Sequence, residues 1–277
     1  MLRYCCLVLL LPSAAWAQSG LTEPTAAPAV TKARVGRKVY LKYYAVPVVT
    51  VPDAGVTARM ARYFSLRNLA GNTEAGLAAD LRRHPDPWSG VPELLQLRYT
   101  VNYNDRGLLS ITSVRESENL QMLGTRQTYN LDLNTGFRLR MADELQPERL
   151  PELLALGEQK LRLIIQTYLA DWPENKPRPV EEPGLLRLHF TPAALGEYRL
   201  TARGLLFDAA NDESWQTAAA PKDSARVGEF YVDPLPSMRG KLNVTFTYDE
   251  LAPCLKPASP LRRLLSSAAP SADPAAR

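Results

Sequence analysis

The fold is decided by residues 97–145, which read LRYTVNYNDRGLLSITSVRESENLQMLGTRQTYNLDLNTGFRLRMADEL. Apolar and polar residues alternate along most of this stretch, as in β-strands that bury one face. The alternation breaks at Asn104–Gly107 and again at Asn134–Gly136. Asn, Asp and Gly tolerate the positive φ angles that tight hairpin turns require. The stretch therefore predicts an antiparallel β-meander.

The alternation also predicts which side chains share a face of the meander. Every second residue of a strand points to the same side of the sheet. One apolar face is expected to hold Leu97, Tyr99, Val101 and Tyr103 from the first strand, Leu109 and Ile111 from the second, Tyr129, Leu131 and Leu133 from the third, and Phe137, Leu139 and Met141 after the second turn.

Upstream of the meander, the sequence predicts one strand and two helices. Residues 37–51 are rich in Val and Tyr, and Pro47 interrupts or ends the strand that they predict. Apolar residues at helical spacing predict a helix over 56–64, with Gly71 available as a stop, and a second short helix over 73–82.

Downstream of the meander, an apolar stripe over 153–169 predicts a long amphipathic helix with Pro151 in its first turn. Alternation then predicts a strand over 186–190, a hairpin over 198–207 and closing strands over 230–232 and 242–248. This order of elements predicts an α+β fold of two packed subdomains, in which an antiparallel β-meander carries helices on one side.

The first residues have the three parts of a secretory signal. Arg3 is basic, residues 4–11 are apolar, and Ala15-Trp16-Ala17 places small residues where a signal peptidase needs them, so cleavage is expected after Ala17. The alternatives are an N-terminal anchor or a buried helix, but a bilayer span needs about 20 apolar residues. We therefore expect a periplasmic or secreted protein with no membrane span after cleavage.

The domain organisation expected from these patterns has five parts. Alanine, proline, threonine and serine dominate both ends of the mature chain, which is typical of segments that do not fold. The parts are a signal peptide (1–17), a flexible leader (18–36), a first subdomain (37–145), a second subdomain (146–258) and a disordered tail (259–277).

Cysteine and charge limit the classes of function. The mature chain would keep only Cys254, which can form no intrachain disulfide and has no histidine nearby in the sequence, so we expect a buried or half-buried structural cysteine. The net charge is only +4, and the basic residues are spread along the chain. We expect no nucleic-acid partner, because such proteins concentrate basic residues on one face.

No catalytic group, metal site or cofactor site is predicted. The two histidines, His84 and His189, are far apart in the sequence and show no metal-binding spacing. Ser110 has no following glycine that would form a nucleophile elbow. The adjacent carboxylates Asp212 and Glu213 are most simply solvated loop residues, although paired carboxylates are also the groups that glycosidases use.

Two tryptophans are the candidate ligand-binding residues. Trp215 lies in a polar loop beside Asp212 and Glu213, where an exposed indole can stack on a sugar or anchor a partner. The alternative is that Trp215 folds back over the edge of the sheet as a cap. Trp88 follows Pro-Asp-Pro and allows the same two interpretations.

Several turn and strand motifs follow one another in a recognisable order. They are Tyr103-Asn104 with Gly107–Ser110, Tyr129–Leu133 with Thr135-Gly136 and Asp143–Leu145, Tyr198–Thr201 with Gly204–Phe207, Gly240–Val244, and Tyr248–Leu251. In this order they resemble the bacterial PdaC/SigV-type domain followed by its C-terminal companion domain of unknown function. The resemblance covers roughly residues 37–257.

That pair of domains occurs in the ectodomains of lysozyme-sensing anti-sigma factors and beside the catalytic domain of peptidoglycan deacetylases. The chain shows neither the membrane helix of the first group nor the metal-dependent domain of the second. The resemblance therefore implies an extracytoplasmic α+β module associated with the cell envelope.

The favoured hypothesis is a non-enzymatic binding module that recognises peptidoglycan or a lysozyme-like protein. One alternative is an envelope glycan hydrolase or deacetylase with an unrecognised site around Asp212, Glu213 and Trp215. Another is a structural protein that binds an unidentified partner.

Overall fold

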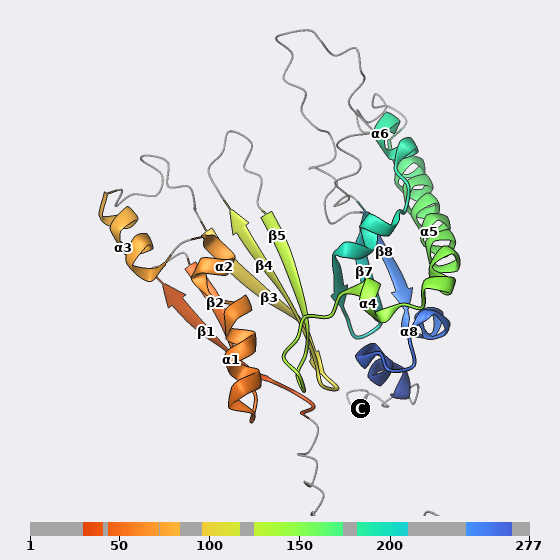
Figure 1. The fold of residues 1–277 in the computed structure, drawn as a ribbon. Coiled ribbons are helices and arrows are strands. Elements are labelled where there is room, and N and C mark those ends of the chain that lie inside the picture. Colours follow the sequence, from red (N-terminus) through yellow and green to blue (C-terminus); the bar gives the residue numbers. More distant parts are fainter. Residues whose placement is uncertain are drawn as a thin grey trace, which may run out of the picture.

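The structure is a computed structural model that describes residues 30–40, 44–71, 73–83, 96–116, 125–173, 182–209 and 242–267. It contains two packed lobes (Figure 1). The first lobe is a five-stranded sheet in the order β1-β2-β3-β4-β5. Its strands are β1 (Arg34–Tyr40), β2 (Tyr44–Thr50), β3 (Gln96–Asp105), β4 (Leu108–Glu116) and β5 (Thr125–Asp132). The predicted α+β class is confirmed.

Three helices accompany this sheet, of which α1 and α2 cover the side that faces away from the second lobe and α3 lies beyond the edge formed by β1 (Figure 1). They are α1 (Ala54–Tyr63), α2 (Leu66–Ala70) and α3 (Glu74–Arg83). Asp53 caps α1 by accepting a hydrogen bond from the backbone N–H of Val56, and Gly71 ends α2 in the left-handed conformation. The two predicted helices are therefore present, and the first of them is divided into α1 and α2.

The meander is formed by β3, β4 and β5, which pair antiparallel in sequence order. Arg106 and Gly107 join β3 to β4 with φ angles of 51° and 73°, which is the two-residue turn that suits the twist of a hairpin. Gly136, with a φ of 70°, forms the second predicted turn. Both turns are confirmed.

The edge of the first lobe differs from the prediction. The described residues 37–40 and 44–50 of this stretch belong to two strands, because β1 and β2 pair antiparallel with Val39 opposite Ala45 and Arg37 opposite Pro47. Pro47 lies within β2, whose pairing with β3 is a single parallel bridge between Tyr44 and Leu97. Proline is tolerated there because β2 has only one continuous hydrogen-bonded neighbour.

The second lobe is built around a three-stranded antiparallel sheet in the order β6-β7-β8. Helix α5 (Leu150–Ala170) packs against β8, with Leu153, Leu161 and Ile165 buried. The remaining elements are α4 (Met141–Glu144), η1 (Pro147–Arg149), α6 (Glu182–Arg187), η2 (Pro192–Gly196), β6 (Tyr198–Leu200), β7 (Gly204–Asp208), β8 (Asn243–Thr247), α8 (Tyr248–Leu251), η5 (Ala252–Cys254) and η6 (Pro260–Ser267), where η denotes a 3-10 helix.

The predicted long helix, the hairpin and the closing strand over 242–248 are thus present in the second lobe, and the strand predicted over 230–232 lies outside the described residues. Pro151 lies in the first turn of α5. Cys254 is buried as expected, and burial raises the pKa of its thiol. Among the described helices, none combines the length and apolarity of a membrane span.

Two predicted strands are absent. Residues 186–190 contain the end of α6 and an irregular segment, in which Leu185 and Leu188 are buried at a spacing of three while Leu186 is exposed. This segment is held to α5, because the Glu158 carboxylate accepts a hydrogen bond of 2.7 Å from the Phe190 N–H. Residues after Gly136 form one bridge, Leu131 to Arg138, before the chain enters α4.

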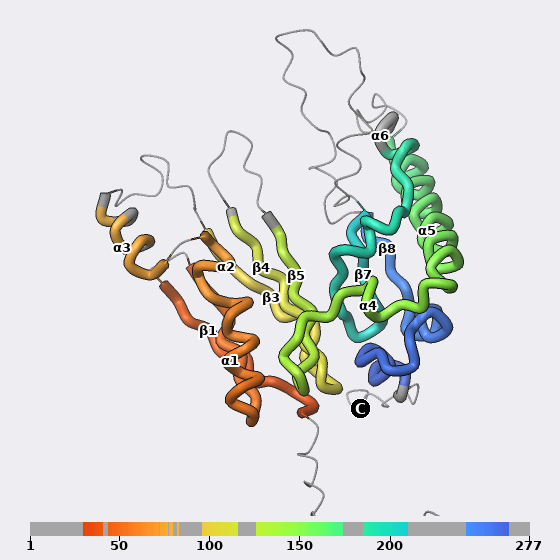
Figure 2. The backbone as a smooth tube through the Cα atoms, in the orientation of Figure 1, coloured from red at the N-terminus to blue at the C-terminus, as the bar shows by residue number. Residues whose placement is uncertain are grey.

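The C-terminal segment joins the two lobes, so the prediction of a disordered tail is wrong for residues 259–267. Leu261 and Leu264 in η6 are buried in the core of the second lobe. Arg263 reaches the first lobe, where its guanidinium lies 2.8 Å from Asp132 Oδ1 and donates to the Gly107 carbonyl. Figure 2 shows this segment in blue beside the turn between β3 and β4. At the other end, β1 begins at Arg34, inside the predicted leader.

Ser259 anchors the same segment to α4. Its hydroxyl donates a hydrogen bond to Glu144 Oε2, and both residues are buried. Burial raises the pKa of the Glu144 carboxyl above its ordinary value of 4.5, because the charged form loses its hydration. The charged carboxylate therefore costs stability that the neutral acid does not.

A first prediction concerns Gly157 in α5. A Cβ at this position would overlap three ring atoms of Phe190, the farthest of them at 2.8 Å, and that ring packs against Phe207 and Phe246. Ala normally stabilises a helix by about 0.5–1 kcal/mol relative to Gly, but overpacking costs about 1–3 kcal/mol. We expect Gly157→Ala to lower the urea midpoint of unfolding.

The matched control is Gly196→Ala, because a Cβ there meets nothing within 4 Å. This variant should unfold at the native midpoint or slightly above it, since Ala restricts the unfolded chain. Equal midpoints for Gly157→Ala and the native chain would contradict the packing of Phe190 against α5.

A second prediction concerns pH. Because the folded-state pKa of Glu144 is raised, the folded state binds its proton more tightly, and stability falls as the pH rises from about 4.5 through that raised pKa. Gln keeps an oxygen that accepts from Ser259 and cannot ionise. Glu144→Gln should therefore have a higher melting temperature than the native chain at about pH 7, and the difference should vanish near pH 4.

The exposed Glu148 in η1 supplies the control. Glu148→Gln should leave the pH dependence of the melting temperature unchanged. A Glu144→Gln variant that is less stable than the native chain at neutral pH would show that the carboxylate itself stabilises the junction.

Candidate functional site

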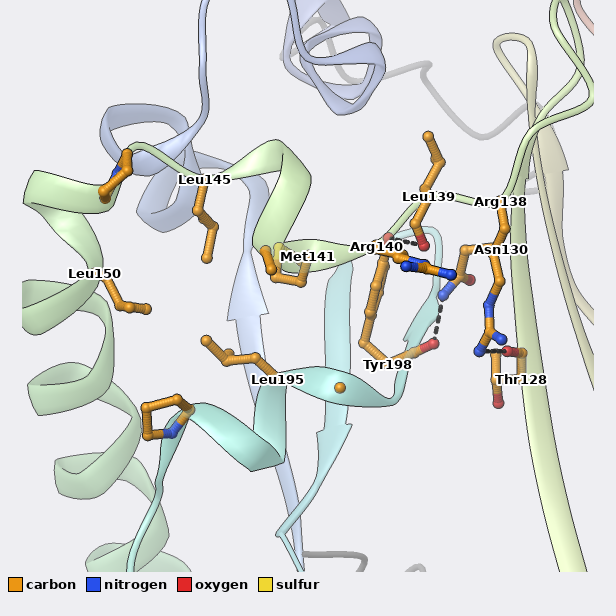
Figure 3. A pocket seen from close by; sticks show the side chains of 14 residues that line it. Thr128, Asn130, Arg138, Leu139, Arg140, Met141, Leu145, Leu150, Leu195 and Tyr198 are labelled. Carbon is orange, nitrogen blue, oxygen red and sulfur yellow. Dashed lines mark hydrogen bonds between the residues drawn. The ribbon is translucent and has the colours of Figure 1, made fainter.

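A pocket of about 500 Å³ lies at the junction of the two lobes, within the size range of small-ligand sites. Its walls come from β5, from the connection between β5 and α5 that includes α4, and from η2 and the start of β6 (Figure 3). One part of the wall is apolar and is formed by Leu139, Met141, Leu145, Leu150, Leu195 and two prolines, Pro147 and Pro192. The other part is polar and contains Thr128, Asn130, Arg138, Arg140 and Tyr198.

The alternation of β5 positions the polar part. Tyr129, Leu131 and Leu133 point to the helical side of the sheet and are buried in the core of the first lobe. Thr128 and Asn130 therefore point to the opposite side, toward the second lobe. They are only 4% and 3% exposed, because β6 packs over this face.

Asn130 is the central polar group of the pocket. Its Nδ2 donates a hydrogen bond of 2.7 Å to the backbone carbonyl of Tyr198, as the dashed line in Figure 3 shows. This bond fixes the orientation of the amide, because only the nitrogen can donate. Asn130 Oδ1 is consequently left buried with no hydrogen-bond partner.

An unpartnered buried acceptor is costly and rare. Leaving such a group unsatisfied costs about 1–3 kcal/mol, and most buried polar side-chain atoms in proteins have a partner. Of the side-chain nitrogen and oxygen atoms that the structure describes as buried, Asn130 Oδ1 is the one without a partner. Asn130 also lines the pocket, so a ligand donor that reached Oδ1 would satisfy it.

Two arginines give the pocket a positive charge. Arg138 is half-buried and uses one N–H to donate to the Thr128 carbonyl at 3.0 Å. Arg140 is exposed, and its side chain forms no hydrogen bond or ion pair with another described residue, although its carbonyl accepts a hydrogen bond from the Asp143 N–H. The 14 residues that line the pocket include no Asp or Glu. The pocket therefore offers an anion two guanidinium groups with unused donors.

Tyr198 separates the polar and apolar parts of the wall. It is 3% exposed, and its hydroxyl donates to the Leu139 carbonyl at 3.4 Å. Burial raises the pKa of Tyr198 far above its ordinary range, so the phenol stays neutral at physiological pH. Its ring thus serves as a fixed wall.

The structure does not place the residues predicted from the sequence to bind a ligand. Trp215, Asp212, Glu213 and Trp88 lie outside the described residues, and so does His84. Their assignment stays a prediction.

The other residues considered for catalysis have structural contacts. Ser110 is fully buried and accepts a hydrogen bond from the backbone N–H of Leu200. His189 is exposed, with Nδ1 3.0 Å from Glu158 Oε1 on α5. Within the described ranges, no group of three or more His, Cys, Asp and Glu side chains is placed to hold a metal ion.

Sequence reasoning did not find the pocket residues. One signal was available, because Ser110, Thr112, Thr128 and Asn130, which alternate with the residues of the predicted apolar face, are all uncharged. Solvent-facing strand positions are more often charged, since Lys, Glu, Arg and Asp are the residues that are rarely buried.

Comparison with known proteins identifies no family. No protein-family model matches the chain, and no curated protein matches it. Two similar solved structures are DUF3298 family proteins. The protein from Pseudomonas aeruginosa PAO1 is 16% identical with a TM-score of 0.46, and the match covers 85% of this chain and 97% of that one. The protein from Bacteroides fragilis NCTC 9343 is 11% identical with a TM-score of 0.48, and the match covers 86% and 98% of the two chains.

Proposed function

We propose that the protein is a ligand-binding module of the bacterial cell envelope and that the pocket at the lobe junction is its binding site. The observation that carries the proposal is the buried, unpartnered Asn130 Oδ1 in the wall of a pocket with two arginines. Binding sites commonly combine an apolar wall with a few convergent polar groups. The polar groups of this pocket can hold and orient a ligand.

The compartment is part of the proposal. The basic residue, apolar run and Ala15-Trp16-Ala17 sequence at the N-terminus support export to the periplasm or the medium. The resemblance of the turn motifs to the PdaC/SigV-type pair supports an association with the envelope.

Peptidoglycan is the ligand that we propose. A pocket of about 500 Å³ accommodates a small chemical unit, and peptidoglycan presents such units in repeated copies. The resemblance also suggests a lysozyme-like protein, which would instead need a surface larger than this pocket. The two partners are separated by experiment.

A third prediction follows for binding to the envelope. The chain from Gln18 onward should be retained by purified peptidoglycan sacculi in a sedimentation assay, and Gly196→Leu should reduce the affinity at least tenfold, or about 1.4 kcal/mol. Gly196 lines the pocket, and a Cβ there enters open space. The new side chain can therefore occupy the pocket without disturbing the core.

The control is Ala202→Leu, which adds a similar side chain to the exposed turn between β6 and β7. It should bind sacculi like the native chain. Capture by immobilised lysozyme with no binding to sacculi would replace peptidoglycan by a protein partner. Retention by neither material would overturn the envelope proposal. If Gly196→Leu bound sacculi as tightly as the native chain, the pocket would not be the binding site.

A further inference from the structure

The arrangement of polar groups in the pocket restricts its ligand more narrowly than the proposed function does. Three features must be matched together. Asn130 Oδ1 requires a hydrogen-bond donor, Arg138 and Arg140 attract a negative charge, and the leucine-rich wall favours an aliphatic group. Figure 3 shows the two arginines and Asn130 on one side of the pocket, with Leu145, Leu150 and Leu195 on the other.

We propose that the pocket binds the carboxyl end of a peptide with an aliphatic last residue. The terminal carboxylate would pair with Arg138 and Arg140, the preceding amide N–H would donate to Asn130 Oδ1, and the side chain would contact Leu195 and its neighbours. This inference rests on the proposed pocket and names the chemistry that the pocket recognises.

Other ligand classes match only part of this arrangement. A fatty acid carries a negative charge and an aliphatic chain, but as a carboxylate it has no donor for Asn130 Oδ1, which would stay without a hydrogen bond. A glycan has many donors, but sugars are usually bound by the exposed faces of aromatic rings. Tyr198, the aromatic residue among the 14 that line the pocket, is buried.

Arginine is suited to the proposed role. Its planar guanidinium binds a carboxylate with two parallel hydrogen bonds, and such charge-assisted bonds are about twice as strong as neutral ones. Arg138 is partly fixed by its bond to the Thr128 carbonyl. The Arg140 side chain has no hydrogen-bond or ion-pair partner among the described residues, so it can turn toward a ligand without breaking such a bond.

The test measures the affinity of synthetic peptides for the full chain by isothermal titration calorimetry. The reference probe is N-acetyl-Leu-Leu with a free carboxylate. Three modified probes are compared with it. The first ends in an amide and lacks the negative charge, the second is N-methylated at the last peptide bond and lacks the hydrogen-bond donor, and the third, N-acetyl-Gly-Gly, lacks the aliphatic side chains. Each modified probe should bind at least tenfold more weakly than the reference. A tenfold loss of affinity corresponds to about 1.4 kcal/mol of binding free energy.

Protein variants assign each effect to a residue. Arg140→Gln should lower the affinity for the carboxylate probe about tenfold and leave the affinity for the amide probe unchanged. The effects of the substitution and of removing the probe's charge are then not additive. Arg203→Gln changes an exposed arginine of the β6–β7 turn, outside the pocket, and should change neither affinity. Thermal unfolding of both variants should match the native chain.

The configuration of the last residue, D or L, distinguishes a peptide of peptidoglycan from the end of a protein. Peptidoglycan peptides end in D-alanine, whereas proteins end in L-residues. Tighter binding of N-acetyl-Lys-D-Ala-D-Ala than of its L-isomer supports both the inference and the peptidoglycan proposal. Tighter binding of the L-isomer supports the inference and replaces peptidoglycan by a protein terminus.

Failure of the inference is distinguishable from failure of the proposed function. If no peptide binds while sacculi still retain the native chain and not Gly196→Leu, the pocket is a binding site for another part of peptidoglycan and the peptide inference is wrong. Equal binding of the N-methylated and the unmodified probe would equally contradict the role of Asn130 Oδ1.

Discussion

The two lobes depend on hydrogen bonds between the side chains of one sheet and the backbone of another. Asn130 on β5 donates to the Tyr198 carbonyl, and Ser110 on β4 accepts from the Leu200 N–H. These bonds satisfy the edge of β6, whose backbone would otherwise be buried without partners. The orientation of Asn130 that the first bond requires also leaves Oδ1 unpaired, so one contact both joins the lobes and creates the polar centre of the pocket.

The C-terminal segment forms a second set of contacts between the lobes. Arg263 in η6 pairs with Asp132, whose side chain is almost fully buried, at the end of β5. Arg106 at the β3–β4 turn donates to the Leu264 carbonyl at 2.9 Å. Removing one partner from a partly buried ion pair is usually more costly than removing a surface pair. The C-terminal segment therefore restricts how far the lobes can separate, and with it the width of the pocket.

Most of the fold was predictable because its signals are local. The positive φ of Arg106 and Gly107 is needed by the turn itself, and the apolar stripe of α5 is read within one helix. Residues 186–190 show where local patterns fail. Their alternation predicts a strand, but the Glu158 carboxylate binds the Phe190 N–H, and this contact with a distant helix decides the conformation.

The pocket was not predictable because none of its walls has a sequence motif. Thr128 and Asn130 lie on the polar face of a strand, and Leu195 and Tyr198 lie about 65 positions later in another lobe. What the sequence did contain was a face of the meander with small uncharged residues, which suits burial against a backbone better than exposure to water. Such a face on an otherwise amphipathic strand indicates a second packed layer, and a polar atom that this layer leaves without a partner, such as Asn130 Oδ1, is the basis for the binding site proposed above.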